Sequence, residues 1–130
     1  MVSFELVSKT HAVAAWLFAL IFIFASFGYS LPIIGPEALL AGWDASNEAL
    51  GFMTRFLAGL MFGLGYFEWV LADHEKTKDV FVRYHIVLVI LVIYSTIGAS
   101  TYWLSWLYAL LVALFLIGGA LGTPAGYTRV

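Results

Sequence analysis

Cysteine is absent from this chain of 130 residues. Its absence excludes disulfides, thiolate metal sites, iron–sulfur clusters and cysteine catalysis together. It also means that the redox compartment of the protein is not readable from its sequence.

Charged residues are scarce as well. They make up 11% of the chain, and six Lys and Arg against eight Asp and Glu give a formal net charge of −2. So few cations cannot follow a phosphate backbone, and we therefore expect no nucleic-acid partner. The chain also lacks the G-x-S-x-G, H-E-x-x-H, P-loop and dinucleotide-binding glycine patterns, so no common catalytic motif indicates a reaction.

Hydrophobic residues dominate what remains, at 63% of the chain, with a mean hydropathy of +0.98. A soluble domain of this length would need more polar residues to cover its surface. Four apolar stretches of about 20 residues match a hydrocarbon core of about 30 Å at a helical rise of about 1.5 Å per residue. They are residues 12–30, 49–72, 80–98 and 102–121.

These stretches predict an all-α integral membrane four-helix bundle, with residues 1–130 as a single transmembrane domain. Helices are expected because every backbone amide in lipid must be paired within its own segment. The first stretch is longer than the apolar part of a signal peptide and no A-x-A-like site follows it, so we expect a retained helix. Residues 44–48 supply N-cap candidates for the second helix.

The cations predict the orientation of the bundle. With four crossings, all of them except Arg55 fall on one side: Lys9, Lys76, Lys78, Arg83 and Arg129. Because cytoplasmic loops carry an excess of Lys and Arg, we expect this side and both termini to be cytoplasmic.

Small residues recur at intervals of four along two of the predicted helices. The sets are Gly51, Arg55, Gly59 and Gly63; Ser105, Ala109 and Ala113; and Gly118 with Gly122. Such stripes let helix backbones approach closely, so we expect them to face other helices, within the chain or across a homodimer seam. Arg55 lies on the first stripe near the outer end of its helix, where it snorkels outward or bonds to Tyr94, Thr96 or loop carbonyls.

Ionisable residues inside the predicted spans are the candidate binding residues. They are Arg55, Glu68, Arg83 and His85, to which the polar Tyr94 is added. Glu68 lies about 7 Å inside its helix end, where a charge requires a partner or a proton. Because the second and third spans run antiparallel, Arg83 and His85 enter at matching depth, and the start of the first span brings His11 to the same leaflet.

The third span carries polar groups on two sides. Arg83 and His85 are two residues apart and point to nearly opposite faces; Tyr94 shares the face of Arg83, and Thr96 that of His85. We therefore expect this helix to be surrounded by protein, at the bundle centre or at a subunit contact.

Three interpretations of Glu68 stay open. It forms a structural ion pair with Arg83, an acid–base catalytic pair with His85 in a lipid-accessible pocket, or a satisfied arrangement without function. His11 and His85 are also weak candidates for metal ligation, as two axial ligands of a haem or as single ligands of a pigment. Three groups that converge on a metal cannot be assembled from the sequence.

Aromatic residues make up 18% of the chain, eleven of them Phe. This content suits contacts with lipophilic molecules such as lipid, sterols, quinones, carotenoids or pigments, and it equally suits lipid-facing surfaces and helix packing.

The stretch RFLAGLMFGLGYFE, residues 55–68, resembles the arginine-then-glycine-rich span of small four-helix bacterial membrane proteins of the DoxX-like group and its relatives. The resemblance covers about one helix, implies the four-helix architecture and a multi-pass location in a bacterial inner membrane, and carries no residue role.

The sequence as a whole predicts a non-enzymatic subunit or homo-oligomer that assembles with other membrane subunits or binds a lipophilic small molecule. A small membrane enzyme of the isomerase type, acting through Glu68 and His85 on a hydrophobic substrate, is the first alternative. A haem or pigment carrier is the second.

Overall fold

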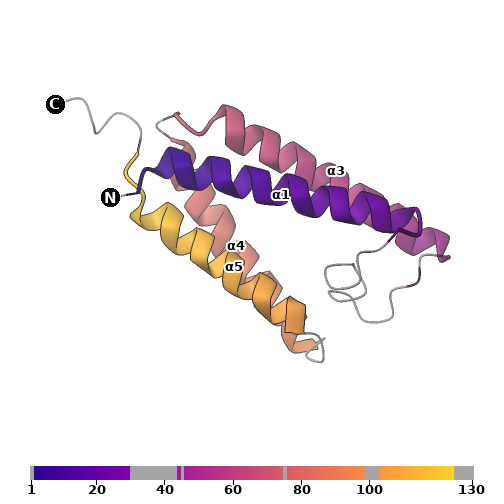
Figure 1. Ribbon diagram of the computed structural model, residues 1–130. Coiled ribbons are helices and arrows are strands. Elements are labelled where there is room, and N and C mark those ends of the chain that lie inside the picture. The colour runs from indigo at the N-terminus through magenta and orange to yellow at the C-terminus, as the bar shows by residue number, and fades with distance from the viewer. Residues whose placement is uncertain (1, 30–43, 45, 75, 99–102, 125–130) are drawn as a thin grey trace.

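The computed structural model shows an all-α chain of four helices (Figure 1): α1 (Phe4–Ser26), α3 (Glu48–Val70), α4 (Thr77–Gly98) and α5 (Trp103–Leu121). It describes residues 2–29, 44, 46–74, 76–98 and 103–124, with the backbone alone for residues 98 and 103–105. Within these residues α1, α3 and α4 are long and apolar enough to cross a membrane, and the apolar part of α5, Trp106–Leu121, is shorter. The prediction of an all-α chain with four helices is confirmed, and three of the four predicted spans are long and apolar enough to cross a membrane within the described residues.

Helix α1 differs most from its predicted bounds, because it begins at Phe4 and ends at Ser26. Its start is fixed by Ser3, whose side chain accepts a hydrogen bond from the Leu6 amide at 3.2 Å. Its end is fixed by Gly28, whose φ of 85° lies in the left-handed region that a side chain disfavours. Capping chemistry, rather than hydropathy, therefore sets both ends of this helix.

The start of α3 is capped as the sequence predicts. The side chain of Asn47 accepts hydrogen bonds from the amides of Ala49 and Leu50, at 3.0 and 3.2 Å. Just before it, the Asp44 carboxylate accepts from the hydroxyl and the amide of Ser46, and these hydrogen bonds hold the pKa of Asp44 below its usual range. The two turns together direct the chain into α3.

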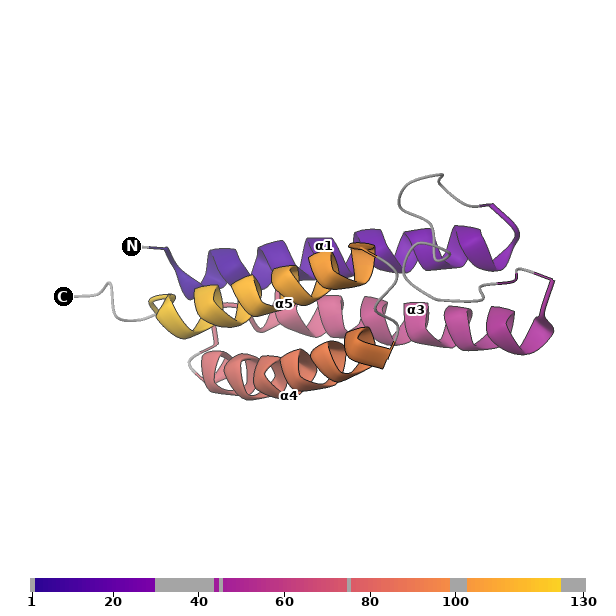
Figure 2. The same ribbon diagram turned by 90° about the horizontal axis from the view of Figure 1, so that it is seen from below.

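The helices form two arms. Helix α1 packs mainly against α3, and α4 against α5. The arms meet where α1 begins and α5 ends, called here the closed end, and they diverge toward the other end (Figure 1). In Figure 2, α5 lies next to α1, and α4 lies on the side of α3 that faces away from α1. At the closed end Phe4, Val7 and Phe81 form a buried cluster. A second buried cluster, of Ala19, Phe22 and Ala58, lies further along the contact between α1 and α3.

Backbone contacts fasten the two ends of the chain together at this closed end. The Phe4 amide donates to the Thr123 carbonyl at 2.9 Å, and the Thr123 amide donates to the Val2 carbonyl at 3.1 Å. The ammonium group of Lys78 donates to the Gly122 carbonyl at 2.7 Å and so joins the start of α4 to the end of α5. The start of α1, the end of α5 and the start of α4 consequently share one end of the molecule.

Small residues are buried along the contact between α1 and α3, and of the predicted stripe on α3 only Gly51 is among them. The buried seam consists of Ala12, Ala15 and Ala19 of α1 with Gly51, Thr54, Ala58 and Gly65 of α3. A Cβ atom added to Gly65 would lie 2.5 Å from Trp16 Nε1 and 3.0 Å from the Ala12 carbonyl oxygen. The helices can approach this closely only because residue 65 has no side chain.

Within the part of the chain that the structure describes, Gly59 and Gly63 of the predicted stripe do not contact another helix, and the homodimer seam stays a prediction for them. No described atom lies within 4 Å of a Cβ atom added to either residue. With 3.6 residues per turn, each step of four residues rotates by about 40°, so three steps carry Gly63 about 120° away from Gly51. On α5 the prediction is confirmed for Gly118 and Gly122, which pack against Val7 and Phe4.

Helix α4 lies at the edge of the bundle and packs mainly against α5, so it does not occupy the bundle centre; the alternative, a subunit contact, stays a prediction. Among its described residues only Phe81, His85 and Thr96 are buried. The opposite faces predicted for Arg83 and His85 are confirmed, since Arg83 is exposed and His85 has an exposed fraction of 0%. Tyr94, on the face of Arg83, is 78% exposed.

Candidate functional site

Glu68 lies in the last turn of α3 and is 6% exposed. The antiparallel seam brings it level with the second and third turns of α1, where the Ser8 hydroxyl donates to the Glu68 backbone carbonyl at 2.9 Å. One helical turn further along, His11 Nδ1 lies 2.5 Å from Glu68 Oε2. The partner of this buried carboxylate is thus a histidine of α1.

His85 completes the group from the other arm. Its Nδ1 atom lies 2.9 Å from the Phe81 carbonyl oxygen, one turn earlier in α4. Its Nε2 atom lies 3.1 Å from His11 Nε2. The residues His11, Glu68 and His85, called here the His–Glu–His cluster, therefore form one continuous chain of polar contacts across three helices.

The contacts limit where the protons lie. A carbonyl oxygen only accepts, so His85 Nδ1 carries a hydrogen. One further hydrogen lies between the two Nε2 atoms, on either ring. The 2.5 Å contact needs one further proton, either on His11 Nδ1 or on the Glu68 carboxyl group. In both cases the cluster carries no net charge, which suits apolar surroundings.

Aromatic rings enclose the cluster. Phe81 stacks on the His85 ring with 3.9 Å between centroids, and Phe115 meets His11 edge-on at 4.8 Å. Tyr84, the neighbour of His85, meets that ring edge-on at 5.2 Å. These rings exclude water from much of the cluster and hold both imidazoles in fixed orientations.

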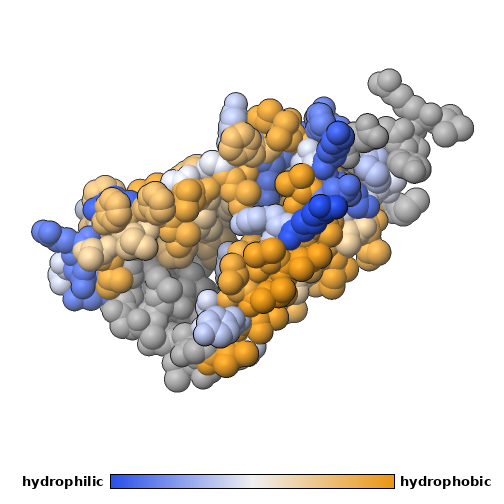
Figure 3. Space-filling view, turned by 180° about the vertical axis from the view of Figure 1, so that it is seen from behind, coloured by the Kyte–Doolittle hydropathy of each residue, from blue (hydrophilic) through white to orange (hydrophobic). Residues whose placement is uncertain are grey.

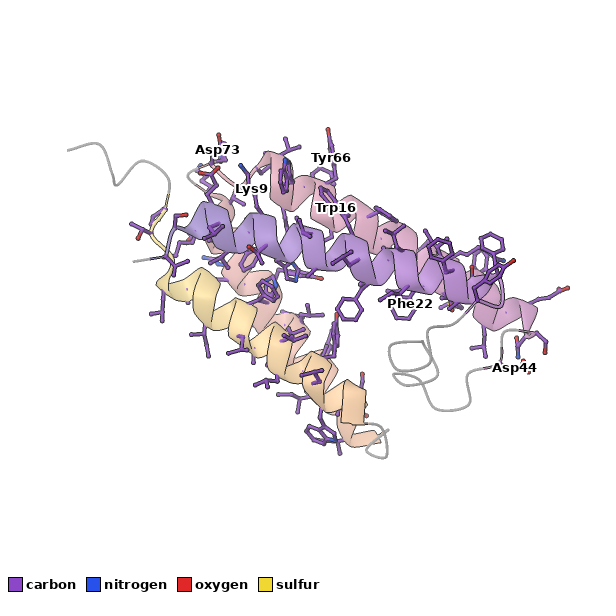
Figure 4. All side chains as sticks on the ribbon, in the orientation of Figure 1. Lys9, Trp16, Phe22, Asp44, Tyr66 and Asp73 are labelled. Atoms are coloured by element: carbon purple, nitrogen blue, oxygen red, sulfur yellow. The ribbon has the colours of Figure 1, made fainter. Side chains whose placement is uncertain are left out.

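Between the diverging arms lies a cavity of about 500 Å³ that reaches His11. Its wall is mainly aliphatic and aromatic, and Phe22 extends from α1 toward it (Figure 4). The polar residues along it are His11, Tyr84, Ser95, Thr96 and Tyr108. Among the residues that the structure describes, no Lys or Arg lines this cavity. It is an apolar pocket with a few hydrogen-bonding groups, the usual composition of a small-molecule site.

The predicted ion pair between Glu68 and Arg83 is not formed in the described part of the chain. Glu68 bonds to His11, and Arg83 is exposed on the outer side of α4. The predicted pair of Glu68 and His85 is connected only through His11. The sequence placed these residues at one depth, but it did not determine which of them meet.

Arg55 and Tyr94 lie away from the cluster. The Arg55 guanidinium folds back beside Gly51, one turn nearer the start of α3, and lies 6.0 Å from the Phe27 ring centroid. This is the outward direction expected of a snorkelling side chain. Tyr94 is too exposed to be a buried partner for Arg55, and the loop carbonyls proposed as acceptors lie outside the described residues.

Sequence reasoning missed several residues of the site. Ser8, Tyr84, Tyr108 and Phe115 carry no charge and so do not stand out in an apolar chain. One signal was present on α1, where Ser8, His11 and Ala15 recur at intervals of three and four and so share one face. That face is the one turned toward α3 and the cavity.

Comparison with known proteins gives no match: no protein-family model, no curated protein and no solved structure corresponds to this chain. The geometry of the site therefore carries the functional argument.

Proposed function

We propose that this chain is an integral membrane protein that binds a lipophilic small molecule in the cavity between its two arms. The observation that carries the proposal is the cavity of about 500 Å³, apolar along its length and ending at His11. Pockets of roughly 300–1,000 Å³ with a few polar groups bind small organic ligands in many proteins. A lipid, a quinone or a pigment with a compact polar group has the matching shape and polarity.

The polar residues favour a neutral ligand group. The hydroxyl groups of Tyr84 and Tyr108 can donate hydrogen bonds to a carbonyl or hydroxyl oxygen, whereas both ring nitrogens of His11 already have partners within the cluster. An anionic head group would require a cation, and none lines the described cavity. We therefore favour a carbonyl or hydroxyl compound over a phospholipid head group.

The bilayer setting rests on the apolar surface. Figure 3 shows apolar side chains along both arms and hydrophilic ones gathered toward the ends, most densely near the termini. We propose that the chain is multi-pass in a bacterial inner membrane, with both termini and the end bearing Lys9, Lys76 and Lys78 in the cytoplasm. The cavity would then open to the hydrocarbon region, which supplies lipophilic ligands.

Filling the cavity tests this proposal. Ala14 lines it, whereas Ala120 is exposed on α5. Native mass spectrometry of protein extracted from its membrane should show a bound molecule on the wild type and on the control variant Ala120→Phe, and loss of that molecule in Ala14→Phe. Equal occupancy in Ala14→Phe and Ala120→Phe, with both variants folded, would contradict the proposal.

An enzyme is the second candidate, because a close carboxyl–imidazole pair lies beside the cavity. The pair is Glu68 with His11 rather than with His85. It could move a proton on a bound hydrophobic substrate, as an isomerase requires. A haem carrier is favoured less. If His11 and His85 were the two axial ligands of a haem iron, bonds of about 2.0 Å on opposite sides of the metal would hold their nitrogens about 4 Å apart. The two Nε2 atoms lie 3.1 Å apart.

A further inference from the structure

The two imidazole rings of the His–Glu–His cluster are arranged alike: each has a hydrogen-bond partner at Nδ1, and each directs Nε2 toward the other ring. Each ring is held at Nδ1, His11 by the Glu68 carboxyl group at 2.5 Å and His85 by the Phe81 carbonyl oxygen at 2.9 Å. Each ring directs its Nε2 atom to the same point, with 3.1 Å between the two atoms. The rings lie on different arms of the molecule, so tertiary packing produces this convergence.

This is the arrangement of histidines that bind a metal. A ligating histidine usually donates its second ring N–H to a carboxylate or a backbone carbonyl, which fixes the tautomer and the ring orientation. Both outer partners are present here. Two imidazole nitrogens bound tetrahedrally at about 2.0–2.1 Å lie about 3.3 Å apart. The observed 3.1 Å separation would need only a small opening.

We propose that His11 and His85 bind one divalent transition-metal ion of the zinc class through their Nε2 atoms. Glu68 acts as the orienting carboxylate: ligation at Nε2 places the His11 hydrogen on Nδ1, where it donates to Glu68. The carboxylate also supplies a negative charge next to the cation. His11 lines the cavity, so the remaining coordination positions face the space where an oxygen of water or of a ligand can bind.

The donor set selects the kind of ion. Imidazole nitrogen suits Zn²⁺, Cu²⁺ and Ni²⁺, whereas Mg²⁺ and Ca²⁺ prefer sets of oxygen ligands. The ligand atoms of His11, Glu68 and His85 lie within 4.8 Å of one another, and all three residues are buried. A buried site with two imidazole nitrogens as ligands, and a carboxylate hydrogen-bonded to one of the rings, therefore favours the transition metals. This inference is independent of the lipophilic ligand, because the metal can be tested alone.

Zinc titration of the purified full chain tests the proposal directly. The protein is prepared in detergent with an affinity tag free of histidine, stripped with a chelator, and titrated with Zn²⁺ by calorimetry, with Mg²⁺ as the negative ion. The wild type and the control His74→Ala, which removes an exposed histidine of the turn, should bind one Zn²⁺ per chain. His11→Ala and His85→Ala should weaken binding at least 100-fold. Glu68→Gln should weaken it about 10- to 100-fold, as for outer carboxylates elsewhere.

X-ray absorption of the zinc-loaded wild type tests the same site without any variant, so the test does not rely on the variants folding. The spectrum should show two imidazole nitrogens at about 2.0–2.1 Å from the metal. Absence of saturable Zn²⁺ binding to the wild type would overturn the proposal. So would a spectrum without two imidazole ligands, or unchanged binding in folded His11→Ala and His85→Ala. Loss of the lipophilic ligand in Ala14→Phe with zinc binding intact would separate the two proposals.

Discussion

At the scale of single residues, the apolar background makes the ionisable side chains visible in the sequence but leaves their pairing open. Glu68, Arg83 and His85 were recognised as unusual because a charge within a span is costly. The structure pairs Glu68 with His11, since the seam between α1 and α3 places these residues on facing turns. Spacing along one helix cannot reveal how that helix is rotated toward its neighbours, and this rotation decides every partner in the site.

The buried carboxyl group should be important for stability. Glu68→Ala removes the partner of the buried His11 and leaves a polar ring unsatisfied, so we expect a loss of about 3 kcal/mol. Glu5→Gln is the matched control, because Glu5 pairs with Lys9 at 2.6 Å at a half-exposed position. It should cost at most about 0.5 kcal/mol. Unfolding in mixed detergent micelles measures both, and equal losses would contradict the assigned role of Glu68.

At the scale of elements, the number and length of the helices were predictable because the thickness of a bilayer fixes the length of an apolar segment. The ends of α1 were not, since Ser3 and Gly28 act through capping and backbone conformation. The seam of α3 was also mispredicted: a strict interval of four drifts around the helix, while the actual seam alternates steps of three and four through Gly51, Thr54 and Ala58.

Two glycines of α3 should respond oppositely to the same substitution. Gly65→Ala places a methyl group against the Trp16 ring and the Ala12 carbonyl, and we expect a loss of roughly 1–3 kcal/mol. Gly59→Ala meets no described atom within 4 Å and should be neutral or stabilise the helix by about 0.5–1 kcal/mol. The free energies of unfolding of the two variants test the seam. If Gly59→Ala lost more stability than Gly65→Ala, the assignment of the α1–α3 contact to the Gly65 face of α3 would be wrong.

At the scale of the whole molecule, the divergence of the arms links the fold to the proposed function. Packing is tight where the arms meet at the termini, and the cavity lies where they separate (Figure 1). The His–Glu–His cluster lies between these regions, with Phe81 on one side of it and the cavity on the other. The sequence could not predict this cavity, because it depends on the angle between two helix pairs, and no pattern within either pair encodes that angle.

We expect the chain to function as a homo-oligomer or as a subunit of a larger membrane complex. Helix α4 buries few of its described side chains, and Gly59 and Gly63 of α3 leave a shallow surface on which another helix can pack. Native mass spectrometry of protein released directly from its membrane should show a homo-oligomer or a defined complex with other membrane proteins. A monomer alone, under conditions that preserve known complexes, would contradict this expectation.

The central claim is that the helices cross a bilayer with both termini and the cluster at the cytoplasmic end. The absence of native cysteine makes single-cysteine labelling unambiguous. Asp73→Cys, in the turn after α3, and Ser46→Cys, just before α3, are both exposed and lie at opposite ends of that helix. In intact cells a membrane-impermeant maleimide should label Ser46→Cys at once and Asp73→Cys only after permeabilisation. Equal labelling of both positions from the outside would contradict the account.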